Sequence, residues 1–156
     1  MILTTHALTG AVLGKNISNL WVLIPTSLVI HFAMDHLRHG EYVDVFDSKM
    51  AFNNTWWKVC LDISATLVFL VLFITFNKLD ALQIRNVMLG SFFSAFPDLI
   101  TVIYWKFRFK FLEPIYKFHI WCHKYPRGAK ERIWNFRNGI NDIAVSAIAI
   151  IAFILL

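Results

Sequence analysis

Two pairs of ionisable side chains in this sequence have the spacing of metal ligands. His31 and Asp35 lie four residues apart in an apolar stretch, and a helix would place both side chains on one face. His119 and His123 have the same spacing. Helical zinc sites use this spacing to present two imidazole nitrogens to the ion. An imidazole and a carboxylate so placed can bind a divalent cation. The alternative is that Asp35 pairs with Arg38 or a histidine, and that the second pair belongs to an interfacial aromatic belt.

Further ionisable residues border the same apolar segments. They are His6, His39, Asp62, Asp98 and Asp142. Asp98 follows Pro97, and a proline within a membrane helix frees backbone groups that a bound ion can satisfy. Asp62 could instead bond to Lys58, and Asp142 could belong to a polar packing seam. His39 falls on the helical face of His31 and Asp35, whereas a single histidine such as His6 is more often a core or surface residue than a ligand.

The composition indicates where these residues are held. The chain has 156 residues, is 58% hydrophobic and 16% charged, and has a mean hydropathy of +0.58. An average globular domain has roughly 45–50% apolar and about 25% charged residues, so the excess must face lipid. The length allows a single domain, residues 1–156. Cys60 and Cys122 do not make a disulfide framework, and no nucleic-acid recognition motif is present.

The hydropathy pattern predicts an all-α, polytopic membrane bundle of about five segments. A spanning helix needs about 20 mostly apolar residues. The segments are 2–14, which is short for a span, 20–34, 57–76, 82–105 and 133–156. A turn is expected at 15–19, and an exposed loop or surface helix at 39–54. Residues 106–132 mix cations with aromatic residues, which predicts an interfacial helix beginning near Glu113 and Pro114.

An alternating path through the membrane separates the charges. All lysines and arginines except Lys15, Lys78 and Arg85 fall on the side of the N-terminus. Cytoplasmic loops are enriched in these residues, so we expect an inner (plasma) membrane protein with a cytoplasmic N-terminus and an outside C-terminus. The candidate histidines and aspartates fall on the same cation-rich side. Their gathering at one depth favours a site over an ion pathway.

This set of side chains suits a hydrolytic metal site. Several His and Asp residues without a Cys pair fit zinc or another divalent ion in an open site. Such an ion lowers the pKa of a bound water toward about 7 and polarises a phosphoryl oxygen. Arg38, Arg108 and Lys124, together with Lys110 and Arg127, could hold a phosphate. The alternative is a solvated basic belt attracted to anionic lipids.

Four short motifs resemble one known family. They surround His6 (THALTG), His31 and Asp35 (HFAMD), Asp98 (FPDL), and His119 and His123 (FHIWCH). They are similar to motifs of the inner-membrane metal-dependent hydrolases, which resemble zinc-dependent phospholipase C and the zinc single-strand nucleases. The family's LPDLD is FPDLI here, without the second aspartate, and its HRGxxHS is not evident.

The resemblance implies an all-helical fold with one to three zinc ions. The ligands it implies are His6, His31, Asp35, Asp98, His119 and His123, and we assign Asp35 and Asp98 a catalytic part. The predicted function is hydrolysis of a lipid or lipid-linked phosphate at the cytoplasmic face. The alternative is a non-enzymatic membrane protein that binds metal or a partner through its basic face. An ion transporter is disfavoured, because the opposite half of the membrane holds few ionisable residues.

Overall fold

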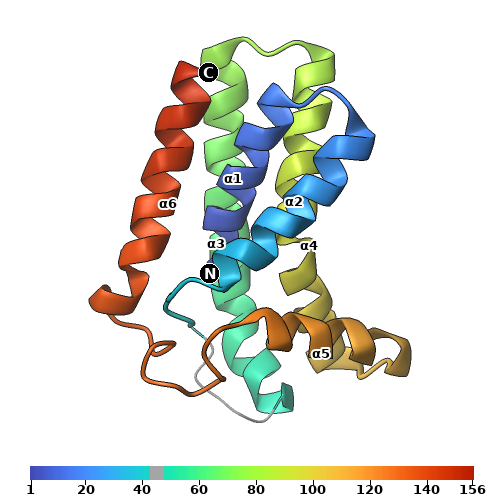
Figure 1. Ribbon diagram of the computed structural model, residues 1–156, viewed down its shortest axis with the longest axis vertical. Helices are drawn as coiled ribbons and strands as arrows, with labels where there is room; N and C mark the ends of the chain where they lie inside the picture. Colours follow the sequence, from blue (N-terminus) through green and yellow to red (C-terminus); the bar gives the residue numbers. More distant parts are fainter. Residues whose placement is uncertain (43–47) are drawn as a thin grey trace.

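The protein is a bundle of α-helices, as the sequence predicts (Figure 1). A computed structural model describes residues 1–42 and 48–156. Its helices are α1 (Leu3–Asn16), α2 (Leu20–Asp35), α3 (Ser48–Asn77), α4 (Ala81–Phe107), α5 (Glu113–Cys122) and α6 (Phe136–Leu155). A single turn of 3-10 helix, Lys110–Leu112, precedes α5. Among the described residues, an α-helix therefore lies in each of the six predicted segments, although several ends differ, and α3 begins at Ser48 instead of near Trp57.

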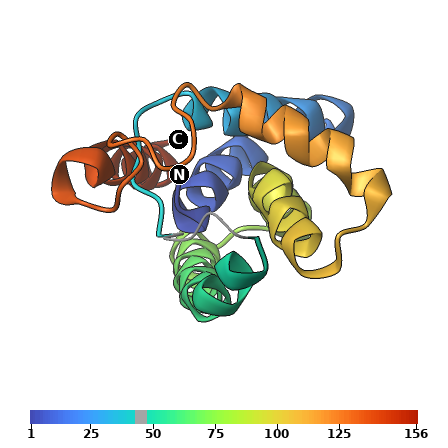
Figure 2. The same ribbon diagram turned by 90° about the horizontal axis from the view of Figure 1, so that it is seen from below.

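Helix α1 lies at the centre of the bundle, between α2, α3, α4 and α6 (Figures 1 and 2). Nine of its fourteen residues are buried, including the polar Thr4, Thr5 and His6. Because other helices surround it, α1 has little contact with the bundle surface. The most enclosed helix of the protein is thus also one of its shortest.

Small residues let α1 approach α4 closely. Gly10 and Gly14, four residues apart on α1, face Gly90 and Asn86 of α4. A Cβ atom on Gly10 would lie 2.2 Å from the carbonyl oxygen of Gly90, and one on Gly14 would lie 2.2 Å from that of Asn86. This is the small-xxx-small packing that brings membrane helices into backbone contact.

The prediction of about five membrane segments is corrected to three helices that could span a bilayer. Among the described residues, these are Phe52–Asn77 within α3, Ala81–Phe107 and Phe136–Leu155. At 1.5 Å per residue, α1 and α2 are about 21 and 24 Å long, whereas the hydrocarbon core is about 30 Å thick. Helix α2 is apolar but too short, and α1 is enclosed. The three long helices expose many large apolar side chains, such as Val71, Phe76 and Ile154, as lipid-facing helices do.

Two carboxylates hold the beginning of α1. The Asp62 carboxylate of α3 accepts hydrogen bonds from the backbone N–H groups of Leu3 (2.7 Å) and Thr4 (3.0 Å), and from the Thr4 hydroxyl. The Asp142 carboxylate of α6 accepts from the N–H of Ile2 at 3.0 Å. The first N–H groups of a helix have no partner within it, and negative charge is favourable there. These two aspartates therefore fix one end of α1 against α3 and α6.

The predicted interfacial segment is helical only in part. Helix α5 begins at Glu113 with Pro114 in its first turn, as predicted, and crosses one end of the bundle beside α2 and α4 (Figure 2). It ends at Cys122, and residues 123–135 form turns and loops that lead to α6.

The predicted turn at 15–19 joins α1 to α2, where the Asn19 side chain caps α2. The predicted exposed segment 39–54 differs from the structure, because His39 is buried and helix α3 already begins at Ser48. Part of that prediction, residues 43–47, lies outside the described residues.

Candidate metal centre

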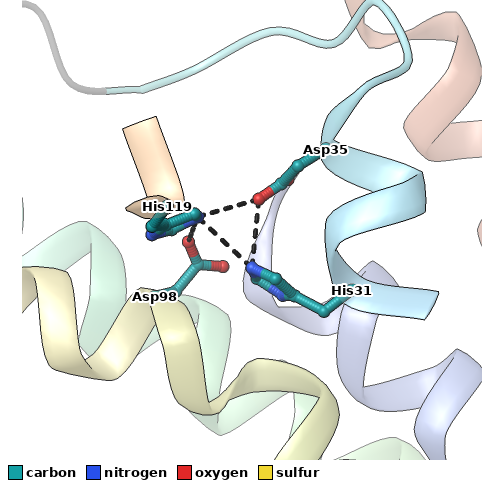
Figure 3. Close-up of side chains that lie close together, drawn as sticks. All are labelled: His31, Asp35, Asp98 and His119. Carbon is teal, nitrogen blue, oxygen red and sulfur yellow. Dashed lines mark hydrogen bonds and ion pairs between the residues drawn. The ribbon is translucent and has the colours of Figure 1, made fainter. Parts of the chain in front are cut away.

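Four ionisable side chains meet where α2, α4 and α5 come together (Figure 3). His31 and Asp35 project from the last two turns of α2, Asp98 comes from α4, and His119 from α5. One ligand atom from each lies within 4.8 Å of the others, so the four could hold a metal ion. His31, Asp35 and His119 are buried, and Asp98 is partly buried. The two four-residue spacings seen in the sequence thus supply three of these four residues.

The ligand atoms have the separations of a tetrahedral site. Four atoms bound to zinc at about 2.0–2.2 Å lie roughly 3.3–3.6 Å from one another. The Asp35 Oδ2 atom lies 3.1 Å from His31 Nε2 and 2.9 Å from His119 Nε2. The two Nε2 atoms are 3.3 Å apart, and His119 Nε2 lies 3.6 Å from Asp98 Oδ1. A small rearrangement of these side chains would place all four at bonding distance from one ion.

The hydrogen bonds of the two Nδ1 atoms determine which ring nitrogens of His31 and His119 carry protons. His31 Nδ1 donates to the carbonyl oxygen of Ser94 at 2.8 Å, and a carbonyl can only accept. The Thr101 hydroxyl donates to the Pro97 carbonyl, so its oxygen accepts from His119 Nδ1 at 2.8 Å. In neutral imidazoles both Nε2 atoms then carry lone pairs. With both imidazoles neutral, two such lone pairs would face the Asp35 carboxylate oxygen, and a metal cation would satisfy all three.

A second group shares Asp35 with the first. It consists of Asp35, His39 and His123, again with ligand atoms within 4.8 Å of one another. His123 Nε2 lies 3.5 Å from Asp35 Oδ2, and the His39 and His123 rings are 5.3 Å apart. Burial lowers the pKa of His123 to about 3, so its imidazole is neutral at physiological pH, as a metal ligand must be. A carboxylate common to two groups is suited to bridge two ions.

His6 adjoins the first group from the central helix. Its Nε2 atom lies 3.1 Å from Asp35 Oδ1 and 3.7 Å from Asp98 Oδ2, and its ring is 4.2 Å from that of His31. The amino group of Met1 also contacts Asp35 Oδ1, at 2.8 Å. The structure therefore gathers the six residues implied by the resemblance in one place, with the other five around the carboxylate of Asp35. They are His6, His31, Asp35, Asp98, His119 and His123.

The secondary candidates separate into two classes. His39 belongs to the second group, although α2 has already ended at Asp35, so the chain beyond the helix carries His39 to the site. Asp62 and Asp142 lie outside both groups, and they bind the backbone at the start of α1. They lie at the same end of the bundle as the two groups because α1 begins there and they bind its first backbone N–H groups.

The cations selected as phosphate ligands mostly lie away from the centre. Arg38 donates to the Asn138 side chain at 2.6 Å, while Arg108 and Lys124 are exposed and lie over the rings of Tyr104 and Tyr125.

Arg127, which the sequence indicated as a possible phosphate ligand, lines a cavity of about 70 Å³ that also reaches Asp98, His119 and His123, and so does Arg132, which was not predicted. Sequence spacing could not show this, because both arginines lie in the irregular segment after α5. Ser94 and Thr101, which orient the histidines, also went unpredicted; each lies on α4 within four residues of Asp98.

Comparison of the chain with protein-family models, with curated proteins and with solved structures finds no match. The fold and the site define an all-helical protein with three helices able to span a membrane and a buried His and Asp cluster that could hold a metal ion.

We expect Thr101→Val to weaken metal binding without abolishing it. The substitution removes the oxygen that accepts from His119 Nδ1, and loss of such a partner typically costs 10–100-fold in metal affinity. A competition titration with a chromophoric chelator measures the effect. Thr9→Val is the control, because the Thr9 hydroxyl bonds only to its own helix, at the Thr5 carbonyl. Equal zinc affinities of the two variants would contradict this assignment.

Proposed function

We propose that the protein is a membrane-embedded, metal-dependent hydrolase that cleaves a phosphoester of a lipid or lipid-linked substrate. The observation that carries the proposal is the convergence, in a buried place, of the Nε2 atoms of His31 and His119 on an Asp35 carboxylate oxygen, while both Nδ1 atoms are hydrogen-bonded elsewhere. With both imidazoles neutral, a metal cation would accept both Nε2 lone pairs and balance the charge of the carboxylate. The proposed setting is the cytoplasmic face of an inner (plasma) membrane, with the N-terminus on that face.

The residues present fit zinc, one to three ions, better than a hard cation. Imidazole nitrogens outnumber carboxylates around Asp35, and zinc favours nitrogen ligands whereas magnesium and calcium favour oxygen. His31, Asp35, Asp98 and His119 would hold one ion, and His39 and His123 with Asp35 a second. Bound zinc would supply Lewis-acid polarisation of a phosphoryl oxygen and increase the acidity of a water molecule.

The chain's own residues would orient the substrate and move a proton. Asp98 lines the cavity, and its Oδ2 atom is buried without a hydrogen-bond partner in the described part of the chain. We assign this oxygen as the acceptor of a proton from the attacking water. Arg127 and Arg132 line the same cavity, where guanidinium groups would hold a phosphate and balance its charge.

The proposal is tested by measuring metal content and turnover on one preparation. The protein is purified in mild detergent, its zinc is measured by elemental analysis, and phosphate release is followed from phosphatidic acid and a polyprenyl phosphate, with headgroup release from phosphatidylcholine. We expect about one zinc or more per chain and turnover of at least one substrate. The double variant H31A/H119A should lose both zinc and turnover, because it removes two ligands of the first group.

His36→Ala is the matched control. This histidine follows α2 directly, but it is exposed and its Nδ1 atom donates to the carbonyl oxygen of Cys122. The control should retain zinc and activity. Zinc-free wild-type protein from zinc-replete cells would end the proposal. Bound zinc without turnover of any substrate would favour the non-enzymatic, metal-binding alternative.

A further inference from the structure

Two cavities of opposite character meet beside the candidate metal centre. The first, the arginine cavity, has a volume of about 70 Å³ and is the one lined by Arg127 and Arg132. The second, the α3–α4 groove, has a volume of about 290 Å³ and is lined almost entirely by apolar residues of α1, α3 and α4. Leu3, Val59 and Val102 line both. The cavity that contains the arginines and the apolar groove therefore adjoin each other along these three side chains.

The arginine cavity offers several donors that lack acceptors, although the Arg132 guanidinium also donates to Glu41, which lines the same cavity, and to the carbonyl oxygen of Tyr125. The guanidinium of Arg127 stacks on the Trp105 ring at 4.6 Å and has no hydrogen bond to any described residue. The Nε atom of Arg132 and the Nε1 atom of Trp105 are buried without a partner in the described part of the chain, and so is the hydroxyl of Thr55. Arg132, Trp105 and Thr55 are only 6%, 3% and 2% exposed. Donors grouped in this way suit a ligand rich in acceptor oxygens, such as a phosphate.

The α3–α4 groove opens onto the surface that faces lipid. Ile63 and Leu67 of α3, and Met88 and Phe92 of α4, line it and are each more than a third exposed. They belong to two of the three helices able to span a membrane. A lipid chain could therefore enter the groove sideways from the bilayer without crossing polar surface.

Charge distinguishes this groove from a larger one on the other side of α3. That second groove, of about 810 Å³, lies between α1, α3 and α6 and has Asp62 and Asp142 among its lining residues. None of the described residues that line this groove is a cation that could balance the two carboxylates, whereas Arg127 and Arg132 balance Glu41 and Asp98 in the arginine cavity, where Glu41 is paired with Arg132. Arg127, which has no ion pair with a described residue, thus lines the cavity that adjoins an apolar groove on the α4 side of α3.

We propose that a membrane lipid with a phosphate headgroup binds across both compartments. Its phosphate lies in the arginine cavity beside Asp98 and His119, with Arg127 as the principal ligand. Its chain passes Leu3, Val59 and Val102 and lies in the α3–α4 groove. This inference rests on the proposed function in taking the lipid as substrate, but the binding itself requires no metal and no turnover.

Photo-crosslinking tests the binding site directly. The protein is placed in nanodiscs of phosphatidylcholine that contain a small fraction of phosphatidic acid or phosphatidylcholine with a photoreactive group in one acyl chain. Labelling is measured with zinc and with a chelator, and the labelled peptides are identified by mass spectrometry. We expect phosphatidic acid to label groove residues such as Ile63, Leu67 and Met88 at least about fivefold more than phosphatidylcholine does, because its phosphomonoester is anionic overall whereas the choline cation neutralises the phosphate of phosphatidylcholine.

Matched variants separate the two compartments. Arg127→Gln should remove the preference for phosphatidic acid, whereas Arg137→Gln, at an exposed arginine at the start of α6, should keep it. Ala95→Leu narrows the α3–α4 groove and should reduce groove labelling, whereas Ala147→Leu on α6 should not.

The possible outcomes distinguish this inference from the proposed function. Preferential labelling in the chelator arm, without turnover in the zinc arm, would support the lipid site and refute the hydrolase. Turnover with equal labelling by the two lipids, or with labelling spread over all lipid-facing helices, would overturn the lipid site and leave the hydrolase standing. An unchanged preference in Arg127→Gln would also overturn it.

Discussion

Asp35→Asn should abolish metal binding and reduce phosphoester hydrolysis at least about 10³-fold. Asp35 is the one residue common to the two candidate ligand groups, and its carboxylate lies within 3.5 Å of four imidazole nitrogens. The substitution keeps the shape of the side chain but removes the negative charge and replaces one oxygen with an amide nitrogen. We therefore expect it to affect both groups at once, more strongly than the loss of any single histidine.

Zinc per chain, measured after equilibration with a weak chelator, checks this result together with the hydrolysis rate. Asp142→Asn is the control, because Asp142 is a buried carboxylate at the same end of the bundle that lies outside both groups. The control should retain zinc. A fully zinc-loaded Asp35→Asn protein would show that the ion is held elsewhere.

Gly10→Ala should cause a large loss of stability, because it adds a methyl group where α1 and α4 are in backbone contact. The new Cβ atom would lie 2.2 Å from the carbonyl oxygen of Gly90 and 2.7 Å from the Ser94 Cβ atom, so α1 and α4 must move apart. Overpacking in a core typically costs about 1–3 kcal/mol, and we expect the upper end or more because the obstacle is backbone. Thermal unfolding in detergent, followed by circular dichroism, measures the effect.

Gly139→Ala is the control that separates the effect of steric crowding from the effect of replacing glycine with alanine in a helix. Gly139 lies within α6, and a Cβ atom there would meet nothing within 4 Å. Alanine is favoured over glycine inside a helix by about 1 kcal/mol, so this variant should be as stable as wild type or more stable. A Gly10→Ala protein that unfolds at the wild-type temperature would contradict the close approach of α1 and α4.

The helices were predictable because their signals are local. Apolar runs located five of them, and a mixture of cations with aromatic residues, together with Pro114, located α5. The number of membrane spans was not predictable in this way. Hydropathy shows that a segment is apolar, but it does not show whether the segment is surrounded by lipid or by other helices. The apolar residues of α1 are enclosed by other helices together with the polar Thr5 and His6, so they face protein and not lipid. Lipid and protein interior favour similar residues, so only the packing separates the two cases.

The ligands were predictable where the helix itself sets the spacing. His31 with Asp35, and His119 with His123, were found from separations of four residues. The partners that orient the rings were not found, because Ser94 acts through a backbone carbonyl that every residue has, and Thr101 through a contact between α4 and α5. Arg127 and Arg132 reach the cavity through an irregular segment, for which residue spacing carries no directional information.

The central position of α1 has a consequence for the order of assembly during synthesis. The helix is surrounded by α3, α4 and α6, which all follow it in the chain. Its final environment therefore does not exist while it leaves the ribosome, and its beginning has no caps until Asp62 and Asp142 have been made. His119 and His123 are likewise synthesised late. The nascent chain therefore cannot bring the four residues of the first group together until α5 has been made, and an ion held by all four would bind only after that stage.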